Sequence, residues 1–370
     1  MTIALLANNT TYVYNLRKEI IQELISLGYR VVIVAELLEY TQELVEMGCI
    51  LQSIVVGRHG KNPLADICLC KNYYKILKND KVDIVLTYNI KPNVYGGIAC
   101  QMLKIPCISN VTGLGTPLEN KSWIQFILKR LCKIGFSKVN TVFFQNSANQ
   151  QFFNDNKLLS NQTHQVLLPG SGINLQDFSY CEYTEDGGVI RFLFVGRIMK
   201  EKGIGIFLAA AKKFASNQVK FDVVGGCDDA KYESILREYE KQGLIIWHGQ
   251  QKNVKKFYCE CNCLLFPSYY PEGMSNVTQE AAATGRPAIV ANRPGCKEIV
   301  DNGMSGFVVS VNDEDATLLA VEIFLKMTFE QRKQMGIAAR HKVEIEFDRK
   351  IVVDKYIEEI RTICKSMFDR

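Results

Sequence analysis

The feature of this 370-residue sequence that most restricts its fold is a repeated alternation of short apolar runs and helical stretches. In the first half the runs are TIALLA, VVIVA, VDIVLTY, PCISN, NTVFF and HQVLLP, and helical patterns lie between them at 14–27, 64–78 and 123–134. Apolar runs of strand length that are separated by helices are typical of parallel sheets covered on both faces. The first half therefore predicts one doubly wound α/β domain.

The second half repeats this plan with the runs IRFLFVG, KFDVVGG, LIIWHG, CLLFP, PAIVAN and GFVVS. A chain of this length usually has more than one core, so we predict two doubly wound, Rossmann-like domains. The boundary falls near PGSGINLQDFSY, a stretch with turn chemistry, which divides the sequence into 1–170 and 171–348.

The composition and the first residues bear on where in the cell the protein works. No apolar run approaches the roughly 18 residues of a membrane-spanning helix, and the opening MTIALLANN has no basic start of the signal-peptide kind. We expect a cytoplasmic protein whose 13 cysteines are reduced thiols. Cys259, Cys261 and Cys263 suggest a metal cluster, but their C-x-C-x-C spacing favours buried small side chains instead.

The net charge of +5 is unevenly distributed. Between residues 84 and 150 there are several Lys and Arg residues, and Glu119 is the only acid. This excess predicts an acidic partner for the first domain. A phosphate-bearing ligand and an anionic lipid surface are the favoured partners, and nucleic acid is the less favoured one.

Two cations follow the first strand of the second domain. Arg197 and Lys202 lie in RIMKEKG, directly after FLFVG, where a doubly wound sheet binds its ligands. They suit a diphosphate, because Arg supplies a planar fork of donors and Lys a point charge; two solvated surface cations are the alternative. No G-x-G-x-x-G follows the first strand of either domain, and there is no P-loop motif. Both absences argue against NAD-type and P-loop sites.

The stretch PSYYPEGMSNVTQEAAATGRP places Glu272 and Glu280 on either side of a helix start. The first N–H groups of a helix attract anions, whereas carboxylates accept hydrogen bonds from hydroxyl groups. A nucleotide sugar supplies both kinds of group, because its two phosphates lie between two polyhydroxylated rings. The acids 313–315 also precede a helix, and we predict that they cap it rather than bind metal.

With LLFPSYYP before it and AAATGRPAIVANRPGCKEIVDNGMSGFVV after it, the E-x7-E motif resembles that of the retaining glycosyltransferases of family 4. FVGRIMKEKG and LPGSGINLQDF also match that family. NVTGLG and YNIKPNVYGG are similar to a subgroup that builds capsule, O-antigen or lipid-linked oligosaccharide. The resemblance implies the GT-B fold, in which two Rossmann-like domains face a central cleft. Domain 1–170 would hold the acceptor, domain 171–348 the nucleotide sugar, and the last helix, 349–370, would pack back on the first domain.

By motif match, Glu280 should hold the ribose hydroxyls, and Glu272 the transferred sugar. Arg197 and Lys202 should neutralise the leaving diphosphate, so these two and Glu272 are the predicted catalytic residues. The whole predicted donor site is Gly196, Arg197, Lys202, Gly225, Gly249, Glu272, Gly273, Met274, Ser275, Asn276 and Glu280. The predicted acceptor-side residues are Asn9, Thr10, Lys91, Thr112 and Gly113.

The first domain departs from the family pattern at two places. Asn8-Asn9-Thr10 stands where many relatives have a glycine pair, and YNIKPN lacks the His that many carry there. These departures leave the acceptor contacts open.

The expected reaction is the retaining transfer of a hexose or N-acetylhexosamine from a nucleotide sugar to a polyprenyl-diphosphate-linked saccharide. We expect UDP as the carrier, with GDP as the alternative, and neither a metal nor another cofactor. A nucleotide-sugar epimerase of the same architecture and a non-catalytic nucleotide-sugar-binding protein remain alternatives.

Helix 123–134 predicts peripheral contact with the inner face of the cytoplasmic membrane. Its apolar and basic side chains fall on separate arcs. Packing of the apolar arc on the domain's own sheet is the alternative. The apolar arc is Trp123, Ile124, Ile127, Leu128, Leu131 and Ile134, and the basic arc is Lys129, Arg130 and Lys133.

Overall fold

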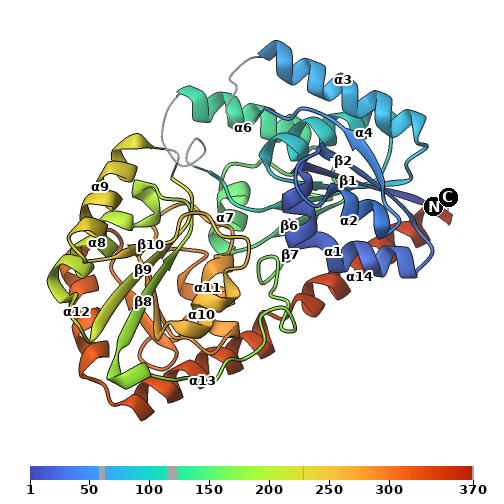
Figure 1. Ribbon diagram of the computed structural model, residues 1–370. Coiled ribbons are helices and arrows are strands. Elements are labelled where there is room, and N and C mark those ends of the chain that lie inside the picture. Colours follow the sequence, from blue (N-terminus) through green and yellow to red (C-terminus); the bar gives the residue numbers. More distant parts are fainter. Residues whose placement is uncertain (58–62, 116–122, 228, 369–370) are drawn as a thin grey trace. The chain divides into compact units, whose positions relative to one another are not determined.

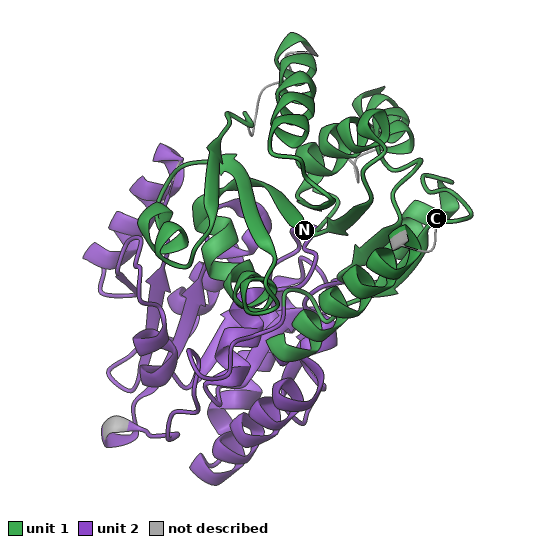
Figure 2. Ribbon diagram, turned by 90° about the vertical axis from the view of Figure 1, so that its right-hand side faces the viewer, with its two compact units in different colours: residues 1–171, 349–370 green, residues 172–348 purple. Residues whose placement is uncertain are grey.

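A computed structural model describes residues 1–57, 63–115, 123–227 and 229–368. The chain divides into two compact units, drawn in separate colours in Figure 2. Unit 1 comprises residues 1–171 and 349–370, and unit 2 comprises residues 172–348.

Unit 1 is built on a sheet that has seven strands within the described residues, in the order β3-β2-β1-β4-β5-β6-β7. Figure 1 labels β1, β2, β6 and β7 of this sheet. All neighbouring strands in it are parallel. The strands are β1 Thr2–Asn9, β2 Arg30–Glu36, β3 Ile50–Ser53, β4 Ile84–Tyr88, β5 Cys107–Val111, β6 Thr141–Phe144 and β7 His164–Leu167. The helices are α1 Thr10–Ser26, α2 Thr41–Glu46, α3 Pro63–Asn79, the π-helical turn η1 Pro92–Gly96, α4 Gly97–Leu103, α6 Trp123–Gly135, α7 Ser147–Asp155 and α14 Arg349–Phe368.

Helices cover both faces of this sheet, as its uninterrupted apolar strands require. Along β1 the side chains alternate, so that Leu6 packs with α3, α4, α6 and α7, and Leu5 packs with α1 and α14. The C-terminal helix α14 thus belongs to the core of unit 1, although the whole of unit 2 precedes it in the sequence.

Unit 2 is built on a six-stranded parallel sheet within the described residues, in the order β10-β9-β8-β11-β12-β13. Its strands are β8 Ile190–Val195, β9 Val219–Val224, β10 Ile246–Trp247, β11 Cys263–Phe266, β12 Ala288–Ala291 and β13 Gly306–Val309. Its helices are the 3₁₀ turns η2 Asp186–Gly188, η3 Lys200–Lys202 and η4 Lys297–Ile299, with α8 Ile204–Phe214, α9 Ala230–Lys241, α10 Lys255–Glu260, α11 Asn276–Ala283, α12 Glu314–Lys326 and α13 Phe329–Glu346.

The prediction of two parallel α/β sheets is confirmed, and each apolar run quoted above contains a strand. The edge strand β3 was missed because ILQS has no apolar run. The capping role of the acids at 313–315 is also confirmed, since Asp313 accepts a hydrogen bond from the Ala316 N–H at 2.9 Å. Among the described helices, none has both the length and the apolar character needed to cross a bilayer.

Candidate active site

Glycines end three neighbouring strands of unit 2. Gly196 follows β8, Gly225 follows β9 and Gly249 lies just after β10. Their backbones are joined, because the Gly225 N–H donates to the Gly249 carbonyl at 2.8 Å. A Cβ at Gly225 would lie 1.8 Å from the Gly196 carbonyl oxygen, so no other residue fits there. This edge, at the carboxyl ends of the strands, is where doubly wound sheets bind ligands.

The loop that carries Lys202 is locked onto the loop after β11. The backbone N–H groups of Tyr269 and Tyr270 both donate to the Glu201 carbonyl, each at 2.9 Å. Gly203 has a φ of 84°, and a Cβ there would approach the Pro267 carbonyl oxygen to 2.5 Å. Glycine at this position therefore lets the two loops touch. As a result Lys202, from one loop, reaches Glu272, from the other.

Two of the three predicted catalytic side chains, Arg197 and Lys202, lie near the Tyr270 ring, and the third, Glu272, pairs with Lys202. The Arg197 guanidinium carbon lies 5.7 Å from the centre of the Tyr270 ring, and the Lys202 ammonium nitrogen lies 4.9 Å from it. Lys202 also forms an ion pair with the Glu272 carboxylate. The exposed fractions of the Lys202 and Glu272 side chains are only 12% and 17%, so water screens this pair weakly. Tyr270 had no predicted role, because an aromatic residue after a buried strand is usually part of the core.

Helix α11 begins next to this cluster. Ser275 is its N-cap, and the Ser275 hydroxyl accepts a hydrogen bond from the Thr278 N–H at 3.3 Å. The Ser275 N–H donates to the Gly295 carbonyl at 2.7 Å, so that amide is engaged within the protein. A Cβ on Gly295 would lie 2.8 Å from the Gly273 carbonyl oxygen. The loop around Gly295 therefore supports the segment that joins Glu272 to α11, a contact the sequence did not reveal.

Glu280 lies just over one turn into α11 and has a buried hydroxyl partner. The Tyr258 hydroxyl, on α10, donates to Glu280 Oε2 at 2.8 Å. Tyr258 is completely buried, and burial, helped by the Glu280 charge, holds the pKa of Tyr258 well above its ordinary value. Tyr258 therefore remains a protonated donor that orients one oxygen of the carboxylate. The sequence pointed to Glu280 but not to Tyr258, because a tyrosine inside a helix is more often a core residue.

The buried Arg286 holds α10 in place relative to the end of α11. Its guanidinium donates to the backbone carbonyls of Cys261 at 2.7 Å, Cys181 at 2.9 Å and Cys259 at 2.5 Å. A further bond reaches the Thr284 carbonyl at 3.0 Å, at the C-terminus of α11. The arginine thus fixes the distance between the helix of Tyr258 and the helix of Glu280.

The structure corrects the expectation that every cysteine is a reduced thiol. Cys181 and Cys259 form a disulfide, although 78 residues separate them in the sequence. Such a pair gives no sequence signal, because the fold alone brings the two residues together. Cys261 and Cys263 are free and buried, as predicted for that cluster.

In unit 1 the predicted residues Asn9 and Thr10 are buried and bond to nearby backbone. Asn9 Oδ1 accepts from the Tyr12 N–H at 2.8 Å and caps α1. The Thr10 hydroxyl accepts from the Leu38 N–H at 2.8 Å and donates to a carbonyl of the same loop. Asn9 therefore holds the first turn of α1, whereas Thr10 ties the start of α1 to the loop after β2.

The other predicted acceptor-side residues lie in the loops after β4 and β5. Lys91 pairs with Asp66 at 2.9 Å. Thr112 accepts a hydrogen bond from the Asn89 side-chain amide at 3.5 Å, and Gly113 has a φ of 140°. Asn89, which the sequence did not single out, also accepts from the Asn8 N–H at 3.3 Å. Asn89 thereby links the ends of three adjacent strands.

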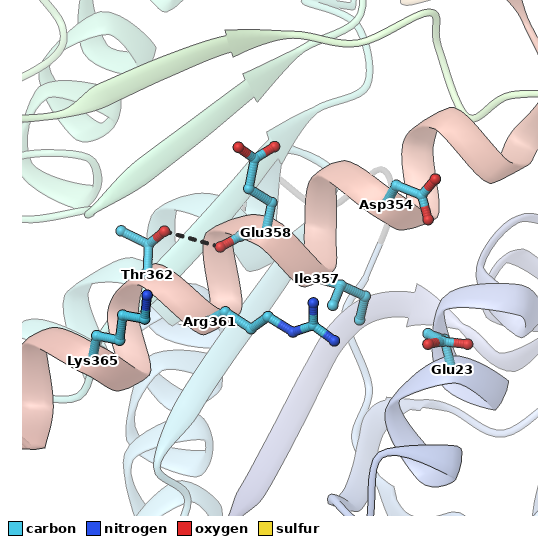
Figure 3. Close-up of a pocket in the computed structure, with 7 residues that line it drawn as sticks. All are labelled: Glu23, Asp354, Ile357, Glu358, Arg361, Thr362 and Lys365. Carbon is cyan, nitrogen blue, oxygen red and sulfur yellow. Dashed lines mark hydrogen bonds between the residues drawn. The ribbon is translucent and has the colours of Figure 1, made fainter.

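A separate groove of about 430 Å³ lies between α1 and α14 in unit 1 (Figure 3). It contains none of the predicted site residues, and along α14 the acids Asp354 and Glu358 come before the bases Arg361 and Lys365. The lining residues are Glu23, Asp354, Ile357, Glu358, Arg361, Thr362 and Lys365.

Comparison with known proteins places both units in the same group of enzymes. Residues 2–146 match the family described as Glycosyl transferase 4-like, and residues 182–342 match the family described as Glycosyl transferases group 1. The chain is 23% identical to the N,N'-diacetylbacillosaminyl-diphospho-undecaprenol alpha-1,3-N-acetylgalactosaminyltransferase of Campylobacter jejuni, over 99% of this chain and 100% of that protein. It is 27% identical to the UDP-Gal:alpha-D-GlcNAc-diphosphoundecaprenol alpha-1,3-galactosyltransferase of Escherichia coli, over 67% of each.

Among solved structures, the sucrose-phosphate synthase of Thermosynechococcus elongatus superposes with a TM-score of 0.82 at 18% identity. The superposition covers 99% of this chain and 100% of that one. The chain therefore belongs to the group 1 and 4-like glycosyltransferases and has their GT-B fold.

Proposed function

We propose that the protein transfers a hexose or N-acetylhexosamine, with retention and without metal, from a UDP-sugar to a polyprenyl-diphosphate-linked saccharide in surface-polysaccharide assembly. The placement of Arg197 and Lys202 beside Tyr270, with Glu272 paired to Lys202, carries the donor part of this proposal. The acceptor class is supported by the two relatives named above, both of which are named for undecaprenyl-diphosphate-linked saccharides. The name of the Escherichia coli relative also includes UDP.

In this proposal Arg197 and Lys202 bind the donor diphosphate, Glu272 accepts hydroxyls of the sugar, and Glu280 accepts those of the ribose. The bond between the sugar's anomeric carbon and the diphosphate oxygen breaks, and the acceptor oxygen bonds to that carbon on the same face. The acceptor's proton passes to the departing phosphate oxygen, so no side chain has to remove it. The two cations stabilise the negative charge that grows on the diphosphate.

Helix α6 supports contact between unit 1 and an anionic membrane. Trp123 is 73% exposed and Phe126 60% exposed, and Ile127 and Ile134 are also exposed. Arg130 and Lys133 are exposed on the same side of the helix. An apolar strip flanked by cations suits the headgroup region of a bilayer.

The predicted apolar arc of α6 is thus divided between core and surface. Leu128 and Leu131 pack on the core of unit 1, whereas the surface part gains Phe126, which the sequence reading had not included. The packing interpretation therefore holds for Leu128 and Leu131, and membrane contact of the exposed part remains a proposal.

Vesicle binding tests the membrane contact. The double variant Arg130→Gln/Lys133→Gln should bind vesicles that contain anionic lipid roughly 30-fold more weakly, since each basic residue near such a surface contributes about 1 kcal/mol. Lys212→Gln/Lys213→Gln, in α8 of unit 2, removes two equally exposed charges and is the matched control. Equal weakening by both variants would remove α6 from the proposal.

A transfer assay tests the reaction itself. UDP- and GDP-linked sugars would each be offered with an undecaprenyl-diphosphate-linked saccharide, and nucleotide release and the anomeric configuration of the product would be measured. Release that depends on the acceptor and a product with retained configuration are expected. A new nucleotide sugar formed without acceptor would identify an epimerase. Donor binding without turnover with any lipid-linked acceptor would identify a binding protein.

A further inference from the structure

The ion pair between Lys202 and Glu272 joins two residues that the proposed function assigns to different parts of the donor. Lys202 is assigned to the diphosphate and Glu272 to the sugar, yet in this structure they hold each other. Lys202 also lies near the rings of Phe266 and Tyr270, at 5.5 and 4.9 Å from their centres. The ammonium is thus surrounded by aromatic faces and one carboxylate.

We propose that this pair makes the site discriminate against a nucleoside diphosphate that carries no sugar. This inference rests on the proposed function and adds to it a role for Glu272 in selecting the ligand and releasing the product. The two ligands differ in the hydrogen-bond donors that they offer to Glu272 once Lys202 has turned to their phosphates.

A diphosphate that enters the site needs the ammonium that Glu272 now neutralises. If Lys202 turns toward the phosphates, Glu272 is left in a mostly buried place beside additional negative charge. A buried carboxylate that loses its cation is strongly unfavourable unless other donors replace it. The free nucleoside diphosphate offers no such donor at this position.

A nucleotide sugar does offer them, because the hydroxyls of its sugar follow directly after the second phosphate. They can donate to Glu272 at the moment when Lys202 leaves it, so neither charge stays unpaired. After the sugar has been transferred these donors depart, and Glu272 competes again with the diphosphate for Lys202. The pair therefore favours entry of the donor and exit of the nucleoside diphosphate.

The surroundings of the pair allow such an exchange with little movement. The backbone around it is fixed, since the Glu272 N–H donates to the Tyr270 carbonyl at 2.8 Å and the two loops are locked together at Glu201. Cys296 lies beside both partners, and burial raises its pKa, so the thiol adds no charge. Only the ends of the Lys202 and Glu272 side chains have to move.

The test is the affinity of the full-length protein for UDP and for UDP-sugars without acceptor, measured by titration calorimetry. Glu272→Gln should bind UDP about tenfold or more tightly than the parent, because Lys202 is then free of its competitor. The same variant should bind the UDP-sugar no more tightly than the parent does. Glu272→Ala should show the same pattern, and it keeps the test valid should the glutamine form a new bond to Lys202.

Glu201→Gln is the matched control, because it removes one negative charge directly next to Lys202 but not the ion pair. It should leave the UDP affinity within about twofold, and thermal unfolding would confirm that each variant is folded. Unchanged or weaker UDP binding in both Glu272 variants would overturn the inference while leaving the transferase proposal intact. If the parent bound neither UDP nor GDP in free or sugar-linked form, the proposed function would fail, and this inference with it.

Discussion

Polar loops follow the central strands of both units. The partners of Lys202 and Glu280 in unit 2 are of a different kind from those of Asn9 and Thr10 in unit 1. In unit 2 the side chains bond to one another, Lys202 to Glu272 and Tyr258 to Glu280. In unit 1 Asn9 bonds to the backbone of the first turn of α1, and Thr10 bonds to the backbone of the loop after β2. Pairs of side chains can exchange partners with a ligand, whereas side chains that hold the backbone cannot leave without loosening the fold. We therefore expect the chemistry in unit 2 and a structural role for Asn9 and Thr10 in unit 1.

The largest effect is expected when two lysines, each paired with a carboxylate, are compared. Lys202→Met should lower kcat/KM by about 10²–10³, the usual cost of removing one group that stabilises developing negative charge. Lys91→Met, which breaks the pair with Asp66 in unit 1, should lower it less than about tenfold, because Asp66 keeps a hydrogen bond from Tyr95 at 2.8 Å. Steady-state kinetics with donor and acceptor varied separately measure both. Equal losses would break the comparison.

The next effect in size is expected at Glu280. Glu280→Gln keeps the side-chain size and an acceptor for Tyr258 but removes the charge. Hydrogen bonds to a charged group contribute about 1.5–3 kcal/mol each, so kcat/KM should fall at least about tenfold and at most several hundredfold. Most of the loss should appear in donor affinity, because the ribose is remote from the reacting carbon. A variant with a lower melting temperature and unaltered donor affinity would contradict the ribose role.

Tyr258→Phe should have a smaller effect, because Tyr258 acts on the donor only through Glu280. We expect the donor KM to rise about three- to tenfold, with kcat changed by less than about twofold. Tyr183→Phe is the matched control, since the buried Tyr183 hydroxyl donates to a backbone carbonyl at 3.2 Å and does not contact Glu280. Tyr183→Phe should lower the melting temperature without changing the donor KM. A similar rise in KM in both variants would make Tyr258 an ordinary core residue.

No effect is expected from chelation of divalent metal. In the proposed site Arg197 and Lys202 would supply the positive charge for the diphosphate, and Asp313 caps the start of α12. Turnover in EDTA should therefore match turnover without it. Loss of activity that Mg²⁺ or Mn²⁺ restores would show that these two cations do not suffice.

The sequence predicted the fold well because strand and helix patterns are local. Each apolar run in unit 2 became one strand, and the helix that carries Glu280 ends before Gly285, which has the expected left-handed backbone with a φ of 79°. The edge strand β3 was missed because half-exposed strands at a sheet edge need no apolar run.

The site was predictable only in part. Charged residues such as Lys202 and Glu272 stand out after a strand, so the sequence pointed to them. Tyr258, Tyr270 and Gly295 owe their places to contacts between segments far apart in the chain, and each looks like an ordinary core or loop residue on its own. In unit 1 the sequence located polar residues correctly after the strands, but it gave no sign that Asn9 and Thr10 face the backbone.

Arg286 affects how the structure responds to reduction of the disulfide. Its guanidinium binds the carbonyls of the same two residues, Cys181 and Cys259, that the disulfide joins. The disulfide and the hydrogen bonds of Arg286 therefore connect the same two chain segments. Only the disulfide depends on the oxidation state of the cysteines. When the disulfide is reduced, the arginine still keeps the two chain segments together, and with them the position of α10. We therefore expect α10, and with it Tyr258, to keep its position in a reducing as well as in an oxidising solution.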